Sequence, residues 1–171
     1  MINEIIKVIG RFFILILIQV LLMNNIQLGG FINPYLYVFF ILMLPLNTPK
    51  WLLLILAFLL GLSIDMFSNT AGMHAAASVF MAYLRPYILE LLSPREGYEM
   101  NHKPTIQHMG TNWFLSYAGI LVFFHHLLLF YLEVFRFSEF FSTFFRVILS
   151  SAFTLLLVVL SQFLFTRTKE N

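Results

Sequence analysis

The sequence predicts an all-α integral membrane protein, a compact bundle of about six transmembrane helices, and two features of its composition support this. Hydrophobic residues make up 60% of the 171 residues, against about 45–50% in soluble domains. Charged residues make up only 11%, where about 25% is usual. A soluble chain of this length has too small a core to bury so much apolar surface. We therefore expect residues 1–171 to form a single polytopic membrane domain.

The first apolar segment, residues 8–28, begins next to Lys7 and contains Arg11. A basic start followed by the apolar run 12–23 is also the pattern of a secretory signal peptide. No small-x-small cleavage motif follows the run, so we interpret it as an uncleaved transmembrane helix. Its length fits a span, which needs about 20 apolar residues.

Two prolines separate the second and third segments, residues 34–46 and 50–67. Pro45 and Pro49 enclose the three residues 46–48, where a tight turn is expected because proline cannot continue a helix without losing a hydrogen bond. The segment 34–46 is short for a span. It either crosses with little tilt, enters the membrane only partly, or is extended by residues on the Gly29 side.

The other three spans are expected at residues 73–92, 113–133 and 144–165. The polar stretch 93–112 divides four spans from two. Between the last two spans, phenylalanines flank the charged residues of the segment 134–146. This pattern favours a segment that lies in the outer interface of the membrane.

The distribution of Lys and Arg predicts that both termini are cytoplasmic. With that orientation Arg136 and Arg146 lie outside, and most of the others lie inside, namely Lys7, Arg11, Lys50, Arg95, Lys103, Arg167 and Lys169. These basic residues form no cluster, so nucleic-acid binding is not expected and lipid is the expected surrounding. Because the chain has no cysteine, disulfides and thiolate metal sites are excluded.

The turn after the third span contains Asp65, a carboxylate at the edge of a hydrocarbon layer. The Ser, Asn, Thr and Gly residues that follow it are typical of a turn. This favours a capping role, in which Asp65 accepts hydrogen bonds from amides of the turn or of the next helix. The alternative is a charge partner for His74 or a ligand of a coupling ion.

Small residues surround this turn on both sides. Gly61 lies four residues before Asp65 on the same helix face and permits close helix approach. Gly72 can adopt a backbone conformation closed to other residues. The next helix then presents small side chains, at Ala75, Ala76, Ala77 and Ser78. We expect the third and fourth helices to pack tightly against each other.

Three histidines and an acidic residue are candidates for chemistry inside the membrane. His74 opens the fourth helix, where a hydrogen-bonding role is expected rather than metal ligation. His126 and Glu133 share a face of the fifth helix, so a polar seam is an open alternative. His125 points about 100° away from its neighbour His126, which disfavours a shared metal. Neither His-Glu-x-x-His nor Gly-x-Ser-x-Gly occurs, so no cofactor is expected and an intramembrane hydrolase is a minor alternative.

Arg85 and Pro86 interrupt the fourth helix near its end. Proline frees a carbonyl one turn back, which the arginine can satisfy, or it can pair with Glu90. We interpret Arg85 as snorkelling from a kinked helix end to the cytoplasmic side. The alternative is a contact point for a partner, together with the small residues Ala75 and Ser78.

The residues around the turn resemble the signature of the rod-shape-determining MreD family. The resemblance covers residues 58–87 and rests on three stretches: Gly61-Leu62-Ser63-Ile64-Asp65-Met66-Phe67-Ser68, Gly72-Met73-His74-Ala75 and Met81-Ala82-Tyr83-Leu84. It implies a non-enzymatic component of the bacterial inner membrane that helps to organise lateral peptidoglycan synthesis. The implied partners are an MreC-like single-span protein and, indirectly, the MreB filament and a RodA-type glycosyltransferase with its transpeptidase. Gly61, Asp65 and Gly72 carry over as architecture of the turn.

The resemblance also implies a fold like that of the substrate-binding subunits of energy-coupling-factor vitamin transporters. A subunit of that kind is the alternative function, and the small residues at 75–78 would then meet its coupling partner. Few polar residues are available for its ligand pocket. For the scaffold function we expect a partner's transmembrane helix to bind along a groove of small residues that includes Gly61 and Ala76.

Overall fold

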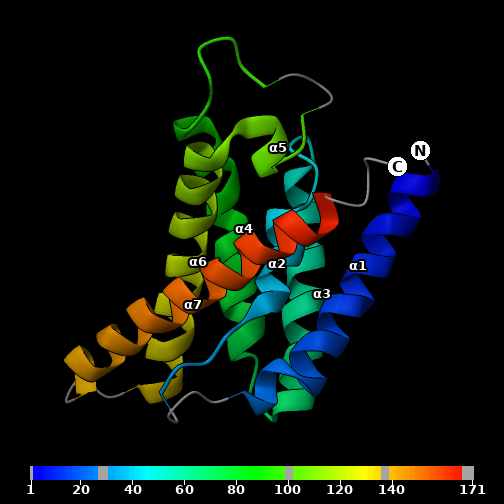
Figure 1. Cartoon of the computed structure of the whole chain (residues 1–171). Helices are drawn as coiled ribbons and strands as arrows, with labels where there is room; N and C mark the ends of the chain where they lie inside the picture. Colours follow the sequence, from blue (N-terminus) through cyan, green and yellow to red (C-terminus); the bar gives the residue numbers. More distant parts are fainter. Residues whose placement is uncertain (1, 27–30, 99–101, 136–138, 167–171) are drawn as a thin grey trace.

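The computed structural model describes residues 2–26, 31–98, 102–135 and 139–166, and the regular structure of these residues is helical (Figure 1). Within them, four segments are long and apolar enough to cross a membrane. They are α1 (Ile2–Leu21) with the short 3-10 helix η1 (Met23–Asn25), α3 (Lys50–Ser68), α6 (Thr111–Val134) and α7 (Phe140–Thr166). The protein is therefore a multi-pass, all-α membrane protein, as its composition predicts.

Helix α4 (Met73–Leu91) is as long as α3, at 19 residues, but it carries charged residues that lower its apolarity. It packs against α3 and against α6, and Figure 1 shows it running beside both. The expected segments 50–67, 73–92 and 113–133 agree with α3, α4 and α6 to within a few residues. Helix α7 already begins at Phe140, so part of the expected interfacial segment belongs to this helix.

The segment 34–46 differs from the spanning helix that its apolar composition indicates. It contains only the 3-10 turn η2 (Leu36–Val38) and the four-residue helix α2 (Phe39–Leu42). Pro34 favours an extended backbone at the residue before it, and helical structure ends before Pro45. The seven helical residues span about 10 Å, far less than the roughly 30 Å of a hydrocarbon core. All residues from Leu36 to Leu44 are buried, so this segment is an internal part of the bundle.

The helices alternate in direction, so the connections gather at two ends of the bundle (Figure 1). The turn from α3 to α4 and the end of α6 lie at one end. The start of α1, the end of α4 and the short helix α5 (Ile106–Met109) lie at the other. At that end Trp113 Nε1 donates to the carbonyl of Leu92 at 2.9 Å, which ties the start of α6 to the end of α4.

Candidate functional site

Gly61 brings the backbones of α3 and α4 into direct contact. A Cβ atom added at this position would lie 2.5 Å from the Cα of Ala75 and 2.5 Å from the carbonyl oxygen of His74. Both neighbours are backbone atoms, which cannot move aside as a flexible side chain can. Glycine is therefore required for the observed packing, and the Gly61 side of α3 is already occupied by α4 of the same chain.

Asp65 caps the start of α4. Its two carboxylate oxygens accept hydrogen bonds from the backbone N–H groups of His74, at 3.0 Å, and Ala75, at 2.9 Å. The hydroxyl of Thr70 donates to the same carboxylate. These bonds satisfy amides that have no partner inside the helix, so the geometry is that of a cap. The Asp65 carboxylate binds the backbone of His74 rather than its ring.

The connection between α3 and α4 needs two residues in the left-handed region of backbone space. Asn69, with φ of 53°, ends α3, and Gly72, with φ of 82°, begins α4. Asparagine tolerates this conformation better than most residues, and glycine adopts it without steric cost. With Gly61 and Asp65, these residues make 61–75 one closely packed unit that joins the two helices.

A buried hydrogen-bond array adjoins this unit at His74. The hydroxyl of Tyr37 lies 2.8 Å from Nε2 of His125 and 3.2 Å from Nδ1 of His74. Tyr37 and His125 are fully buried, and Nδ1 of His125 has no hydrogen-bond partner. The array joins the internal segment to α4 and α6, and it includes two of the histidines that the sequence singles out.

Polar side chains from α1 and α7 satisfy backbone groups of residues 33–37. The Gln19 amide donates to the carbonyl of Pro34 at 3.1 Å and accepts from the N–H of Tyr37 at 3.3 Å. The hydroxyls of Ser150 and Thr154 accept from the N–H groups of Asn33 and Tyr35, each at 3.1 Å. Irregular backbone is tolerated at membrane depth where protein groups satisfy it, so these bonds explain how the segment remains inside the bundle.

His126 belongs to the same polar region but not to a seam with Glu133. Its Nδ1 lies 2.8 Å from the carbonyl of Val122, which makes this nitrogen the donor, and its Nε2 lies 3.1 Å from the Thr154 hydroxyl. Glu133 instead pairs with Arg146 of α7 at 3.2 Å. Among the described residues, no group of three or more His, Asp or Glu side chains is placed to hold a metal ion.

Arg85 is buried, with 1% of its surface exposed, and it holds the end of the internal segment. Its guanidinium donates to the carbonyl of Leu44 and, at 2.6 Å, to the hydroxyl of Tyr117. Tyr117 in turn donates to the carbonyl of Leu42 at 3.1 Å. A cation suits the carbonyl end of a helical segment, so Arg85 serves as an internal cap of α2.

These positions correct part of the expected partner surface. Arg85 does not snorkel, and together with Ala75 and Ser78 it is buried within the chain. Gly61 likewise faces α4 and not an open groove. Ala76 is the exception, because it is exposed on the outer face of α4.

The structure also reveals site residues that the sequence did not single out, above all Tyr37, Gln19, Tyr117 and Thr154. Each is a polar residue within an apolar run, which is the signal that could have drawn attention to them. Their partners lie far away along the sequence.

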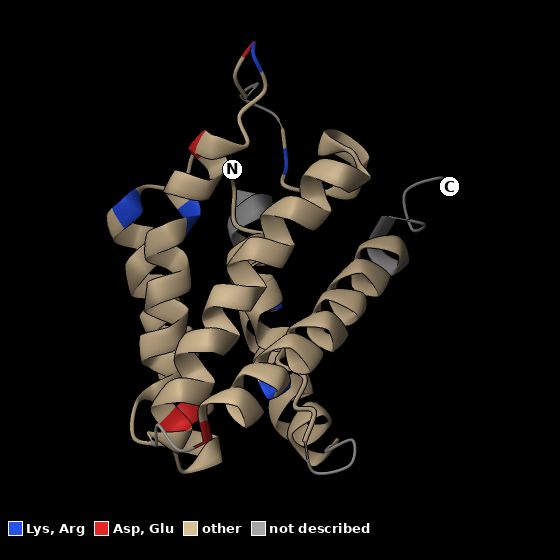
Figure 2. Ribbon diagram, turned by 90° about the vertical axis from the view of Figure 1, so that its left-hand side faces the viewer, with Lys and Arg blue, Asp and Glu red and all other residues tan. Residues whose placement is uncertain are grey.

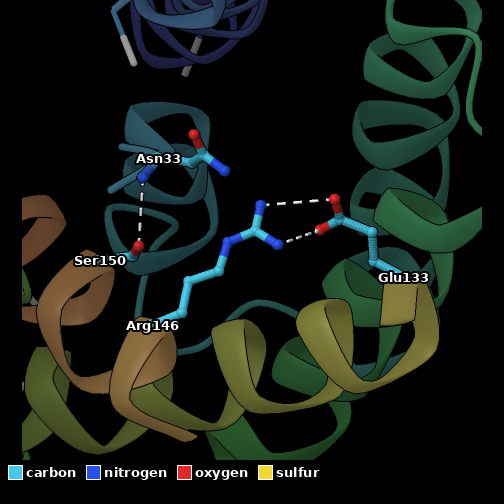
Figure 3. A network of polar contacts seen from close by, with 4 residues as sticks. All are labelled: Asn33, Glu133, Arg146 and Ser150. Carbon is cyan, nitrogen blue, oxygen red and sulfur yellow. Dashed lines mark hydrogen bonds and ion pairs between the residues drawn. The ribbon is translucent and has the colours of Figure 1, made fainter. Parts of the chain in front are cut away.

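A cavity of about 370 Å³ opens at the end of the bundle that holds the α3–α4 turn. His74 and Tyr35 line it, and so do the amide side chains of Asn24 and Asn33. The ion pair of Glu133 and Arg146 lies between this cavity and a second hollow of about 360 Å³, since both are lined by this pair and by Asn33 (Figure 3). The cavity therefore adjoins the buried array at His74.

Comparisons with known proteins give no relative. No family model matches the chain, and neither a curated protein nor a solved structure matches it.

Proposed function

We propose that the protein is a non-enzymatic, MreD-like component of the bacterial cytoplasmic membrane that helps to organise lateral peptidoglycan synthesis during cell elongation. The observation that carries this proposal is the unit 61–75, where the residues of the resemblance each have an architectural role. Gly61 permits backbone contact, Asp65 caps α4, and Gly72 makes the turn. A motif of this kind suits a scaffold, because it fixes the relative position of two helices without requiring chemistry.

The proposed topology has both termini in the cytoplasm. Among the residues that the structure describes, most Lys and Arg lie at the end of the bundle opposite the α3–α4 turn (Figure 2), and Lys and Arg are enriched on the cytoplasmic side of membrane proteins. In this topology α1, α3, α4, α6 and α7 cross the membrane, and the segment 34–46 returns the chain through the interior of the bundle. The polar cavity then opens to the outer side.

The proposed direct partner is an MreC-like single-span protein. This partner would connect the protein indirectly to the MreB filament and to a RodA-type glycosyltransferase with its transpeptidase. Ala76 is the residue of the expected groove that remains available, because it is exposed on α4. A small residue on an exposed helix face permits close approach of a partner helix, and close packing drives association in lipid.

The test is to purify the protein from its native membrane in mild detergent and to identify the proteins that accompany it. We expect an MreC-like protein with MreB or wall-synthesis enzymes. The variant Ala76→Leu should reduce this association, whereas Ala152→Leu, at an exposed alanine of α7, serves as the matched control. Recovery of two ATPases with a coupling membrane subunit would overturn the proposal and favour a vitamin transporter. Equal association of both variants would show that the partner helix binds elsewhere.

A further inference from the structure

The cavity beside the α3–α4 turn is built from parts of the chain that are distant in sequence. Asn24 comes from η1, Asn33 directly precedes the internal segment, Ser68 comes from α3 and Arg146 from α7. Its volume of about 370 Å³ lies within the range of roughly 300–1,000 Å³ that is common for small-molecule sites. Apolar side chains such as Met73 and Leu129 line part of it, as in most such sites, but the amides, hydroxyls and ion pair of the remaining lining indicate a ligand with many polar groups.

The charges of the lining indicate that this ligand carries no net charge. Glu133 and Arg146 are the oppositely charged side chains of the lining, and they face each other in a two-point pair, with nitrogen–oxygen distances of 3.2 and 3.4 Å (Figure 3). The Arg146 guanidinium also lies 4.2 Å from the centre of the Phe130 ring, which holds it in place. Because the two charges of the pair balance each other, the lining offers neither an anion nor a cation an uncompensated charge.

The uncharged groups of the cavity suit a ligand that both donates and accepts hydrogen bonds. Within the part of the chain that the structure describes, the side-chain amide of Asn33 makes no hydrogen bond, and its backbone N–H donates to Ser150 (Figure 3). An amide offers two donors and one acceptor. Such a group matches hydroxyls, each of which gives one hydrogen bond and accepts others.

His74 extends this matching because its protonation pattern can adapt to the ligand. Its Nδ1 contacts the Tyr37 hydroxyl, which also contacts His125 Nε2. The hydroxyl carries one proton, so it donates to one histidine and accepts from the other. If the hydroxyl donates to His74 Nδ1, the proton of the neutral ring is on Nε2, which can donate to a ligand. If the hydroxyl accepts from Nδ1, Nε2 can accept from a ligand instead. The aromatic ring of Tyr35, 5.2 Å from the His74 ring centre, adds a flat apolar surface at the same place.

We propose that this cavity binds an uncharged, polyhydroxylated ring of the saccharide type, either free in solution or as the headgroup of a membrane lipid. The proposal is independent of the scaffold function, because it concerns the outer end of the bundle and needs no protein partner. A ring of this kind presents hydroxyls to Asn33 and the ion pair, and its C–H face to the aromatic side chains.

The test uses the full chain in lipid nanodiscs. Free D-glucose and myo-inositol are titrated by calorimetry, and retention of a glucosyl-diacylglycerol is measured by native mass spectrometry, with inorganic phosphate as the charged probe. We expect binding of the free rings or of the glycolipid, and these two outcomes distinguish the soluble source from the lipid source. Binding of phosphate alone, or of none of these probes, overturns the proposal.

Two variants locate the site. Asn33→Ala and Glu133→Gln should each weaken binding roughly 5- to 10-fold, since one hydrogen bond contributes a factor of that order. Asn47→Ala, an exposed amide in the turn before α3, is the matched control and should bind as the wild type does. Circular dichroism of each variant in nanodiscs verifies that the helices are intact. If binding persists unchanged in both folded cavity variants, the ligand is bound elsewhere and the proposal fails.

Discussion

Gly61 and Ala75 meet backbone to backbone, with no room for even a methyl group between α3 and α4. Ala75 is also one of the two residues whose N–H groups the Asp65 carboxylate holds. The close contact and the cap therefore act on the same turn of α4. Loss of either should loosen the connection between the two helices on which the motif lies.

Replacement of Gly61 by alanine should destabilise the protein despite the better helix propensity of alanine. The propensity gain is about 1 kcal/mol at most. Overpacking costs about 1–3 kcal/mol, and backbone neighbours at 2.5 Å place this site at the upper end. We expect a net loss of about 1–2 kcal/mol, measured by thermal unfolding in detergent with circular dichroism as the readout.

Gly119 in α6 provides the matched control for this prediction. A Cβ there would lie 3.8 Å from its nearest neighbour, a side-chain atom of Leu155, which is an ordinary contact. Gly119→Ala should therefore be neutral or slightly stabilising. Equal behaviour of the two variants would contradict the importance of the close approach at Gly61.

Replacement of Asp65 separates a capping role from a charge role. In Asp65→Asn one side-chain oxygen is replaced by an NH2 group that cannot accept from the α4 amides, so we expect a loss of about 1–2 kcal/mol. Asp65→Ala leaves all its donors unpaired and should cost more, about 2–4 kcal/mol. If association with partners falls in the two variants in proportion to their loss of stability, the capping role of Asp65 is sufficient to explain the effect. A complete loss of function in Asp65→Asn at normal protein level would instead indicate a role of the charge.

The long spans were predictable from the sequence because each combines length with continuous apolarity, and the four apolar spans of the structure were all expected. The segment 34–46 was not, because apolarity does not distinguish a surface that faces lipid from one that faces protein. Residues 36–44 are buried, and the polar side chains that bind their backbone come from α1, α4 and α6. No local pattern records such contacts.

The same limit applies to the buried polar residues. The turn at Asp65 was accessible to sequence reasoning because its hydrogen bonds reach at most ten residues along the chain. Arg85 was assigned to the membrane surface, whereas its acceptor at Leu44 lies 41 residues back. Tyr37 and His125 are separated by 88 residues. Only the packing of the bundle brings these groups together.

Replacement of Arg85 should be among the most damaging single changes in the chain. Arg85→Met removes the bonds to the Leu44 carbonyl and the Tyr117 hydroxyl and leaves both acceptors buried. Because each buried acceptor that is left without a donor costs about 1–3 kcal/mol, we expect much reduced stability and expression in the membrane. Arg85→Lys should not restore stability, because a single ammonium cannot reproduce the planar fork.

Tyr117→Phe makes the test of Arg85 specific to the bond between them. The variant should cost about 1–3 kcal/mol, and its effect should be smaller when Arg85 is already replaced. Arg95→Ala, at an exposed residue after α4, is the control and should change the unfolding midpoint little. Strictly additive effects of the Arg85 and Tyr117 variants would show that the two side chains do not act together.

Tyr37→Phe should remove the hydroxyl that contacts both His74 and His125. Both ring nitrogens that face the hydroxyl would then be unpaired inside the bundle, at a cost of about 1–3 kcal/mol. In histidine labelled with ¹⁵N, we expect the signals of these two rings to shift while those of His102 and His108 stay unchanged. Tyr83→Phe, at an exposed tyrosine of α4, serves as the control. Unchanged signals of His74 and His125 would mean that the hydroxyl does not determine which ring nitrogen carries the proton. His74 could then not change between donating to and accepting from the ligand of the cavity.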